Sequence, residues 1–135
     1  MEYINYLETY QDIAYKIFYN AIKNNRLFHA YLLVGENGTP LAEVAKFIAA
    51  SIILKEENEE PFEIEGKNGY DRILSNTFGD FVYLDAKNGS VKIDEIRFLE
   101  EKFSKTAEEK YGIKVAIING VENLANDSSN ALLKF

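Results

Sequence analysis

The chain has 135 residues, a hydrophobic fraction of 47% and a formal net charge of −7, which suits one compact domain and disfavours direct binding to a phosphate backbone. It contains no cysteine and a single histidine, which excludes disulfides, thiolate zinc sites and histidine-based metal clusters. It shows no long apolar run and no signal peptide, so we expect a cytoplasmic protein without membrane contact.

The first part of the chain predicts a helix, a strand, a loop and a second helix. Apolar residues at helical spacing predict a helix over residues 7–24. Residues 30–34 form a continuous apolar run, typical of a strand buried on both faces of a parallel sheet. A loop follows, and then a helix to about Leu54, with Thr39 expected as its N-cap and Pro40 at its first position.

Residues 55–69 differ in composition, because they hold six glutamates and two glycines. We expect a solvated, mobile surface segment, since so acidic a stretch offers little apolar surface to bury. A cation site is the sharper alternative, but the carboxylates follow no fixed ligand spacing.

The second half of the chain continues the alternation. We expect a strand over residues 81–84, a short extended piece over 91–93 and a helix from Asp94 to about residue 106. Residues 113–118 are almost entirely aliphatic and predict the strongest strand, and Asn126 or Asp127 is expected to cap a last helix. This order predicts an α/β domain over residues 1–135, with a mostly parallel sheet flanked by helices.

Residues 35–42 have the frame of a phosphate-binding loop without its chemistry. Such a loop reads G-x-x-x-x-G-K-[ST] after a strand, and here the window is GENGTPLA. Pro40 replaces the second glycine, Leu41 the lysine that neutralises the phosphates, and Ala42 the hydroxyl that holds magnesium. A chance glycine-rich turn is the alternative for this window alone. The vestigial loop residues are Gly35, Gly38, Thr39, Leu41 and Ala42.

The second half of an ATPase site is also degenerate. The strand over residues 113–118 is followed by Asn119 and Gly120, where an acidic pair would be expected to serve Mg²⁺. Glu122 nearby is interpreted as an exposed loop residue rather than a displaced catalytic carboxylate. Because both half-sites have lost their chemistry, we expect no catalytic residue, no bound cofactor and no metal.

Three further segments resemble bacterial clamp-loader subunits. Residues 26–35 read RLFHAYLLVG, similar to the R-L-x-H-A-Y-L-F-x-G run that leads into the phosphate loop of that family. Residues 91–97, VKIDEIR, resemble its I-x-V-D-x-I-R helix start, and residues 130–134, NALLK, resemble its N-A-L-L-K-x-L-E-E-P segment. Together with the degenerate loop, these segments resemble the delta-prime subunit of DNA polymerase III rather than the ATP-hydrolysing gamma or tau subunit.

The resemblance implies the N-terminal AAA+ (P-loop NTPase-like) domain of a longer protein. Its implied role is a non-catalytic scaffold in the ring that loads the sliding clamp onto DNA during replication. Implied partners are gamma/tau and delta-like subunits, with the clamp and primed DNA reached indirectly, and Asn130 and Lys134 are candidate subunit contacts.

The resemblance also bears on residues 55–78. Many relatives carry a cysteine-ligated zinc module after the second helix, and this chain has no cysteine. We therefore expect residues 55–78 to be a variable acidic insertion in place of that module. Two alternatives to the whole interpretation stay open: an unrelated α/β protein-interaction module, and an ATPase with an atypical P-loop.

Overall fold

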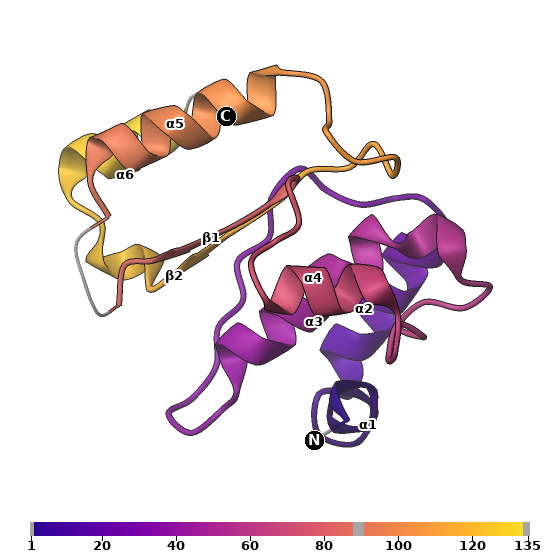
Figure 1. The fold of residues 1–135 in the computed structure, drawn as a ribbon. Helices are drawn as coiled ribbons and strands as arrows, with labels where there is room; N and C mark the ends of the chain where they lie inside the picture. The colour runs from indigo at the N-terminus through magenta and orange to yellow at the C-terminus, as the bar shows by residue number, and fades with distance from the viewer. Residues whose placement is uncertain (1, 88–90, 134–135) are drawn as a thin grey trace. The chain divides into compact units, whose positions relative to one another are not determined.

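The computed structural model describes residues 2–87 and 91–133 and divides the chain into two compact units, Met1–Ser75 and Asn76–Phe135 (Figure 1). The first unit contains α1 (Tyr3–Tyr10), α2 (Asp12–Lys23), α3 (Leu41–Ile53), the short 3-10 helix η1 (Lys55–Glu57) and α4 (Asn68–Leu74). The second contains β1 (Phe81–Asp85), α5 (Ile93–Ser104), β2 (Val115–Asn119), the 3-10 helix η2 (Val121–Asn123) and α6 (Asn126–Leu132). The described elements confirm the α/β class, with six α-helices and a small parallel sheet.

The single helix predicted over residues 7–24 is in fact two helices, because the chain bends at Gln11. This residue has φ −133° and ψ 52°, so it ends α1 and begins α2. Its N–H donates to the Leu7 carbonyl at 3.0 Å, and its carbonyl accepts the Tyr15 N–H at 2.8 Å. Leu7 of α1 and Phe18 of α2 are both buried. No glycine or proline precedes residue 35, so no helix breaker in the sequence marked this bend.

The strand predicted over residues 30–34 is not formed. The sheet of the described chain has two strands, β1 and β2, and residues 30–34 belong to no ladder in it. Leu32 and Val34 are 74% and 84% exposed. An apolar run of this type is buried only when neighbouring strands and helices cover both of its faces. These side chains are hydrophobic enough for a buried strand, but they remain exposed because no neighbouring strand pairs with residues 30–34 in the described sheet.

The helix predicted after the loop is α3, with its start shifted by one residue. Pro40, not Thr39, is the N-cap, and the Pro40 carbonyl accepts the Val44 N–H at 3.0 Å. Proline has no N–H to donate, so its position just before the first turn costs the helix no hydrogen bond. The buried face of α3 includes Val44, Phe47, Ile48, Ala49, Ala50, Ser51 and Ile53.

Residues 55–67 differ from the expected solvated segment. Their glutamates are largely exposed, but Phe62 is 1% exposed and Ile64 is fully buried. The stretch opens with η1 and leads into α4, a helix that the sequence interpretation did not anticipate. Tyr70 and Ile73, three residues apart, form the buried side of α4. The acidic stretch thus contains buried residues, Pro61, Phe62 and Ile64, between its exposed glutamates.

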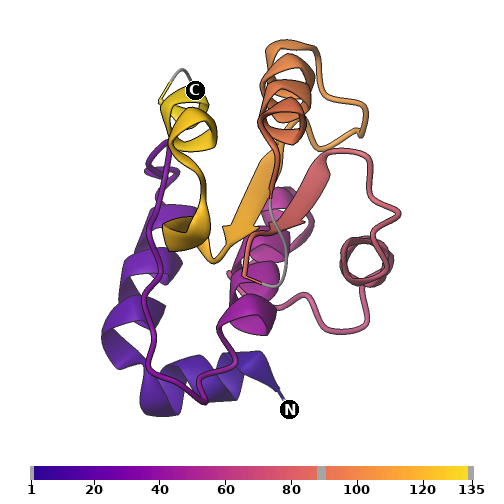
Figure 2. The same cartoon turned by 90° about the vertical axis from the view of Figure 1, so that its left-hand side faces the viewer.

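The second unit is a parallel strand pair with two helices. Phe81 lies opposite Val115 in the ladder and Asp85 opposite Asn119. The two strands, which are labelled in Figure 1, run side by side in both views (Figures 1 and 2). Parallel strands need a long crossover, and the connection from β1 to β2 contains α5. Helices α5 and α6 pack on each other. One hydrophobic cluster of this unit contains the buried residues Ala86, Val91, Ile96 and Ala131, with Leu84, Ile93, Ile118, Leu124 and Leu132 packed against it.

Some boundaries in this unit differ from the prediction. Helix α5 begins at Ile93 after Lys92, so Asp94 is inside the first turn rather than the cap, and residues 91–93 form no strand. Strand β2 starts at Val115 instead of residue 113. The N-cap of α6 is Ala125, so the two predicted caps, Asn126 and Asp127, lie inside the first turn of the helix. None of the helices in the described ranges is long and apolar enough to cross a membrane.

Candidate functional site

The vestigial loop folds as a tight turn that uses its own amide donors. The Thr39 N–H donates to the Glu36 carbonyl at 3.1 Å, and the Leu41 N–H donates to the Thr39 carbonyl at 2.8 Å. Gly38 has φ 94°, the left-handed conformation that glycine adopts readily. Phosphate loops hold their ligand with converging backbone N–H groups. Here two amides point into the loop itself, and Pro40 between them has none to offer.

A groove of about 690 Å³ runs beside this loop, within the first unit. Its walls come from α1, α2, residues 31–36 and the start of α3, and they are mainly apolar, with Ile13, Leu32 and Leu41 among them. The residues lining it include no lysine, arginine or histidine, and Glu36 is their one charged member. A triphosphate placed here would meet a carboxylate and hydrocarbon instead of the positive charge it requires.

The end of β2, in the second unit, has no room for a side chain at Gly120. Asn119 is the last residue of the strand, and its carbonyl accepts the Ala86 N–H at 2.8 Å. Gly120 has φ 77°, and a Cβ added there would lie 2.8 Å from the backbone nitrogen of Lys87. Glycine therefore fits this position, because any other residue would require the backbone around Lys87 to move.

The remaining predicted residues are dispersed. Glu122 is exposed within η2, as expected of a surface residue. Asn130 is exposed on α6, where its carbonyl accepts the Leu133 N–H at 3.2 Å. Lys134 lies outside the described residues. The subunit-contact roles of Asn130 and Lys134 stay predictions.

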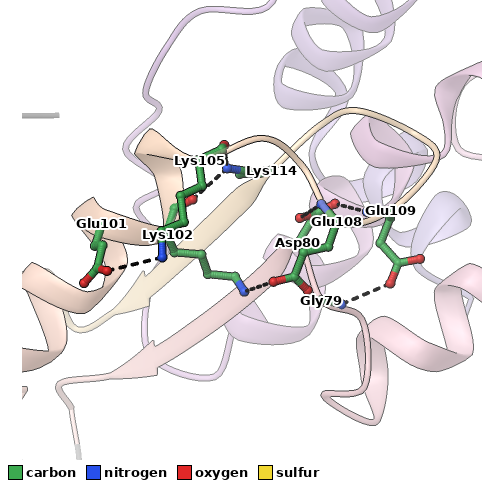
Figure 3. Close-up of polar contacts among 8 residues, drawn as sticks. All are labelled: Gly79, Asp80, Glu101, Lys102, Lys105, Glu108, Glu109 and Lys114. Carbon is green, nitrogen blue, oxygen red and sulfur yellow. Dashed lines mark hydrogen bonds and ion pairs between the residues drawn. The ribbon is translucent and has the colours of Figure 1, made fainter.

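Asp80 is a buried carboxylate that the sequence interpretation missed. It has no exposed surface, and it accepts the backbone N–H groups of Glu108 and Glu109 at 2.9 and 2.7 Å (Figure 3). The Glu109 carboxylate in turn accepts the Gly79 N–H at 3.3 Å. Because backbone amides satisfy both oxygens of Asp80, this carboxylate fixes the loop that precedes β2.

A lysine reinforces the same loop from the other side. The Lys114 ammonium donates to the Lys102 carbonyl at 2.6 Å and also to the Lys105 carbonyl (Figure 3). These carbonyls belong to the end of α5, where a positive charge is favourable. Lys102 and the exposed Glu108 also form an ion pair at 3.3 Å. The only sequence signal for the cluster was the Gly-Asp pair directly before an apolar strand.

Comparison with known proteins gives consistent matches. Residues 10–135 match the family model described as DNA polymerase III, delta subunit. The chain is 35% identical over 120 residues to DNA polymerase III subunit delta' of Bacillus subtilis (strain 168), covering 89% of this chain and 36% of the relative. It is 32% identical over 126 residues to subunit tau of the same organism, covering 92% of this chain and 22% of the relative.

The chain thus spans only about a third and about a fifth of the lengths of these relatives. No solved structure gives a significant match.

Proposed function

Because this chain belongs to the DNA polymerase III delta-subunit family and is similar to a delta-prime subunit, we propose that it is a clamp-loader component that does not hydrolyse ATP. Its role is that of a scaffold: an AAA+-like domain against which ATP-binding neighbours in the ring move while the clamp is loaded onto DNA. Membership of the family removes the alternative of an unrelated α/β interaction module.

The observation that carries the non-catalytic part of the proposal is the geometry of the vestigial loop. Phosphoryl transfer depends on positioned donors and cations that neutralise charge on the transferred phosphate. At the loop, the amides of Thr39 and Leu41 are bonded internally, and the adjoining groove has no cationic lining residue. At the end of β2, the backbone of Lys87 leaves no room for a side chain on Gly120. The two losses are independent of each other, and each would impair catalysis.

The proposed partners are gamma/tau-like and delta-like subunits, with the clamp and primed DNA contacted through the assembled ring. The similarity to subunits delta' and tau supports this assignment. The net charge of −7 is consistent with DNA being held by other members of the ring. Exposed residues of α6 such as Asn130 are the proposed contact with a neighbouring subunit.

Reconstitution tests the partner assignment. The full-length protein that carries this chain is mixed with the gamma/tau-like and delta-like subunits of the same organism, and the mixture is analysed by size exclusion and by clamp loading. We expect one stable complex, with loading lost when this protein is omitted. Separate elution of this protein from the other subunits would overturn the partner assignment, whatever its behaviour toward ATP.

Nucleotide assays test the non-catalytic part separately. The isolated protein is expected to show no ATP turnover above a buffer blank, and turnover that survives repurification would refute the proposal. The variant Leu41→Lys restores one charge, which contributes only about 0.3–1 kcal/mol at a helix terminus. Micromolar binding needs about 8 kcal/mol. Calorimetric titration of this variant with Mg-ATP should therefore give a Kd no tighter than roughly millimolar, on the scale of about 4 kcal/mol.

A further inference from the structure

Residues 58–65, named here the strap, connect η1 to the turn before α4 and are anchored by Phe62. The Phe62 ring is 1% exposed and stacks on Phe47 of α3, with a centroid distance of 5.7 Å and an interplanar angle of 18°. It also contacts Tyr15 of α2 at 5.4 Å. Ile64, two residues later, is fully buried. The strap therefore covers aromatic side chains that two helices contribute.

The backbone of the strap is strained at its anchor. Phe62 has φ 73°, a left-handed conformation that bulky residues rarely adopt. A residue in this region persists only when its surroundings hold it there. Here the buried ring is what keeps the backbone in place, so the strain is released if the ring leaves its site.

A polar contact holds the strap from outside. Glu60 accepts a hydrogen bond from the Tyr19 hydroxyl, and its other oxygen lies 2.6 Å from the Lys23 ammonium. Tyr19 and Lys23 are four residues apart on α2 and so project from one face of that helix. These two hydrogen bonds, that of Lys23 foremost, lower the pKa of Glu60, and Glu60 raises the pKa of Lys23.

The polar contact and the aromatic anchor are adjacent. Tyr19 packs on Tyr15 at 5.7 Å, and Tyr15 in turn contacts Phe62. The ion pair itself is open to solvent, since both side chains are 42% exposed. An exposed pair is weakened by salt, whereas the buried aromatic anchor is not. Two contacts thus hold the strap closed: the Glu60–Lys23 ion pair, which salt weakens, and the buried Phe62 ring, which salt does not weaken.

We propose that residues 58–65 are a strained strap that Glu60 holds closed across α2, and that loss of the Glu60 contacts lets the strap open locally around Phe62. Opening uncovers the aromatic faces of Phe47 and Tyr15 while α3 stays folded. Opening of the strap is a local conformational change within the first unit, and the proposal holds whether or not the loop over residues 35–42 binds nucleotide.

Amide hydrogen exchange of the full chain tests the proposal. The variant Glu60→Gln removes the charge, and Glu59→Gln is its matched control, because Glu59 is exposed and forms no hydrogen bond or ion pair with the described residues. In Glu60→Gln, we expect amides within residues 60–65 to exchange on the order of fivefold faster than in the wild type. In Glu59→Gln, the change should stay within about twofold.

Two further readouts decide between local opening and general destabilisation. Amides in the centre of α3 should keep their wild-type rates in Glu60→Gln, and wild-type protein in about 1 M salt should approach the variant, because screening at that concentration acts over about 3 Å. Equal acceleration in the Glu60 and Glu59 variants, or acceleration of α3 to the same extent as the strap, would overturn the proposal.

Discussion

Residues 30–34 and the strap, residues 58–65, are both parts of the first unit without helix or ladder, yet their side chains lie in opposite environments. The first segment is apolar, and its Leu32 and Val34 are 74% and 84% exposed. The strap is rich in glutamate, and its Phe62 and Ile64 are 1% and 0% exposed. The difference teaches that burial in this chain is set by which neighbours are at hand, because α2 and α3 supply an aromatic surface to the strap.

The same free-energy term, burial of apolar side chains, distinguishes the two segments. Full burial of a large apolar side chain contributes about 1.5–3 kcal/mol relative to exposure. Residues 30–34 largely forgo this contribution. The strap gains it at Phe62 and Ile64, offset by a backbone strain at Phe62 of about 1–3 kcal/mol. Substitutions in the two segments should therefore differ sharply in effect.

The largest expected effect is that of Phe62→Ala. Removing a buried phenylalanine ring costs about 3–5 kcal/mol, and the left-handed φ of this residue remains unfavourable for alanine. We expect the free energy of unfolding to fall by about 3 kcal/mol. Chemical denaturation followed by circular dichroism measures this, since the chain has no tryptophan to report by fluorescence.

Leu32→Ala is the counterpart in the other segment. Because Leu32 is 74% exposed, its truncation should change the free energy of unfolding by no more than about 0.5 kcal/mol. Similar losses in both variants would show that the contrast between the two segments does not hold in solution.

A smaller effect is expected at Gly69, where α4 follows the strap. A Cβ at this position would lie 2.7 Å from a methyl group of Leu54, a fully buried residue. Gly69→Ala should therefore overpack the core, at about 1–3 kcal/mol, against a gain in helix propensity of about 0.5–1 kcal/mol. The net loss of about 1 kcal/mol is measurable by the same denaturation experiment.

Asn68→Ala is the matched control for this effect. Asn68 is exposed in the first turn of α4, so the change to alanine introduces no contact with Leu54. If both alanine variants were neutral, the close packing of Gly69 in α4 on Leu54, the C-cap of α3, would be refuted.

The spacing of apolar residues along the sequence predicted the approximate positions of most helices and strands. Strands β1 and β2 and helices α3, α5 and α6 lie within a few residues of their predicted positions. The prediction was wrong at Gln11, where no helix breaker marks the bend, and at residues 30–34, where burial required strands that the described sheet does not contain. The spacing of apolar residues within a segment does not show whether neighbouring strands are present to cover it.

For the candidate site, too, the sequence predicted some features and not others. The sequence showed which side chains are absent from the loop and from the end of β2, because a motif specifies residue types at fixed spacing. It could not show that the loop amides are bonded internally, or that Lys87 closes the space beside Gly120, because both depend on backbone geometry. The acidic composition of residues 55–69 also concealed Phe62, whose ring contacts Phe47 of α3 and Tyr15 of α2.

The smallest predicted effect concerns the pH dependence of the strap. Hydrogen bonds from Lys23 and Tyr19 lower the pKa of Glu60 from its ordinary value of 4.5 in the closed state. When the strap is open, the carboxylate returns to that ordinary value, so the open state takes up a proton first as the pH falls. The contribution of Glu60 to closure is therefore complete above pH 4.5 and is lost as the pH falls through the lowered value. Comparing the exchange rates of wild type and Glu60→Gln at each pH cancels the intrinsic pH dependence of amide exchange. We expect the difference between the two proteins in residues 60–65 to be constant from neutral pH down to about pH 5 and to shrink as the pH falls further, through the lowered pKa of Glu60. A difference that persisted undiminished at the acid end would mean that the negative charge of Glu60 does not hold the strap.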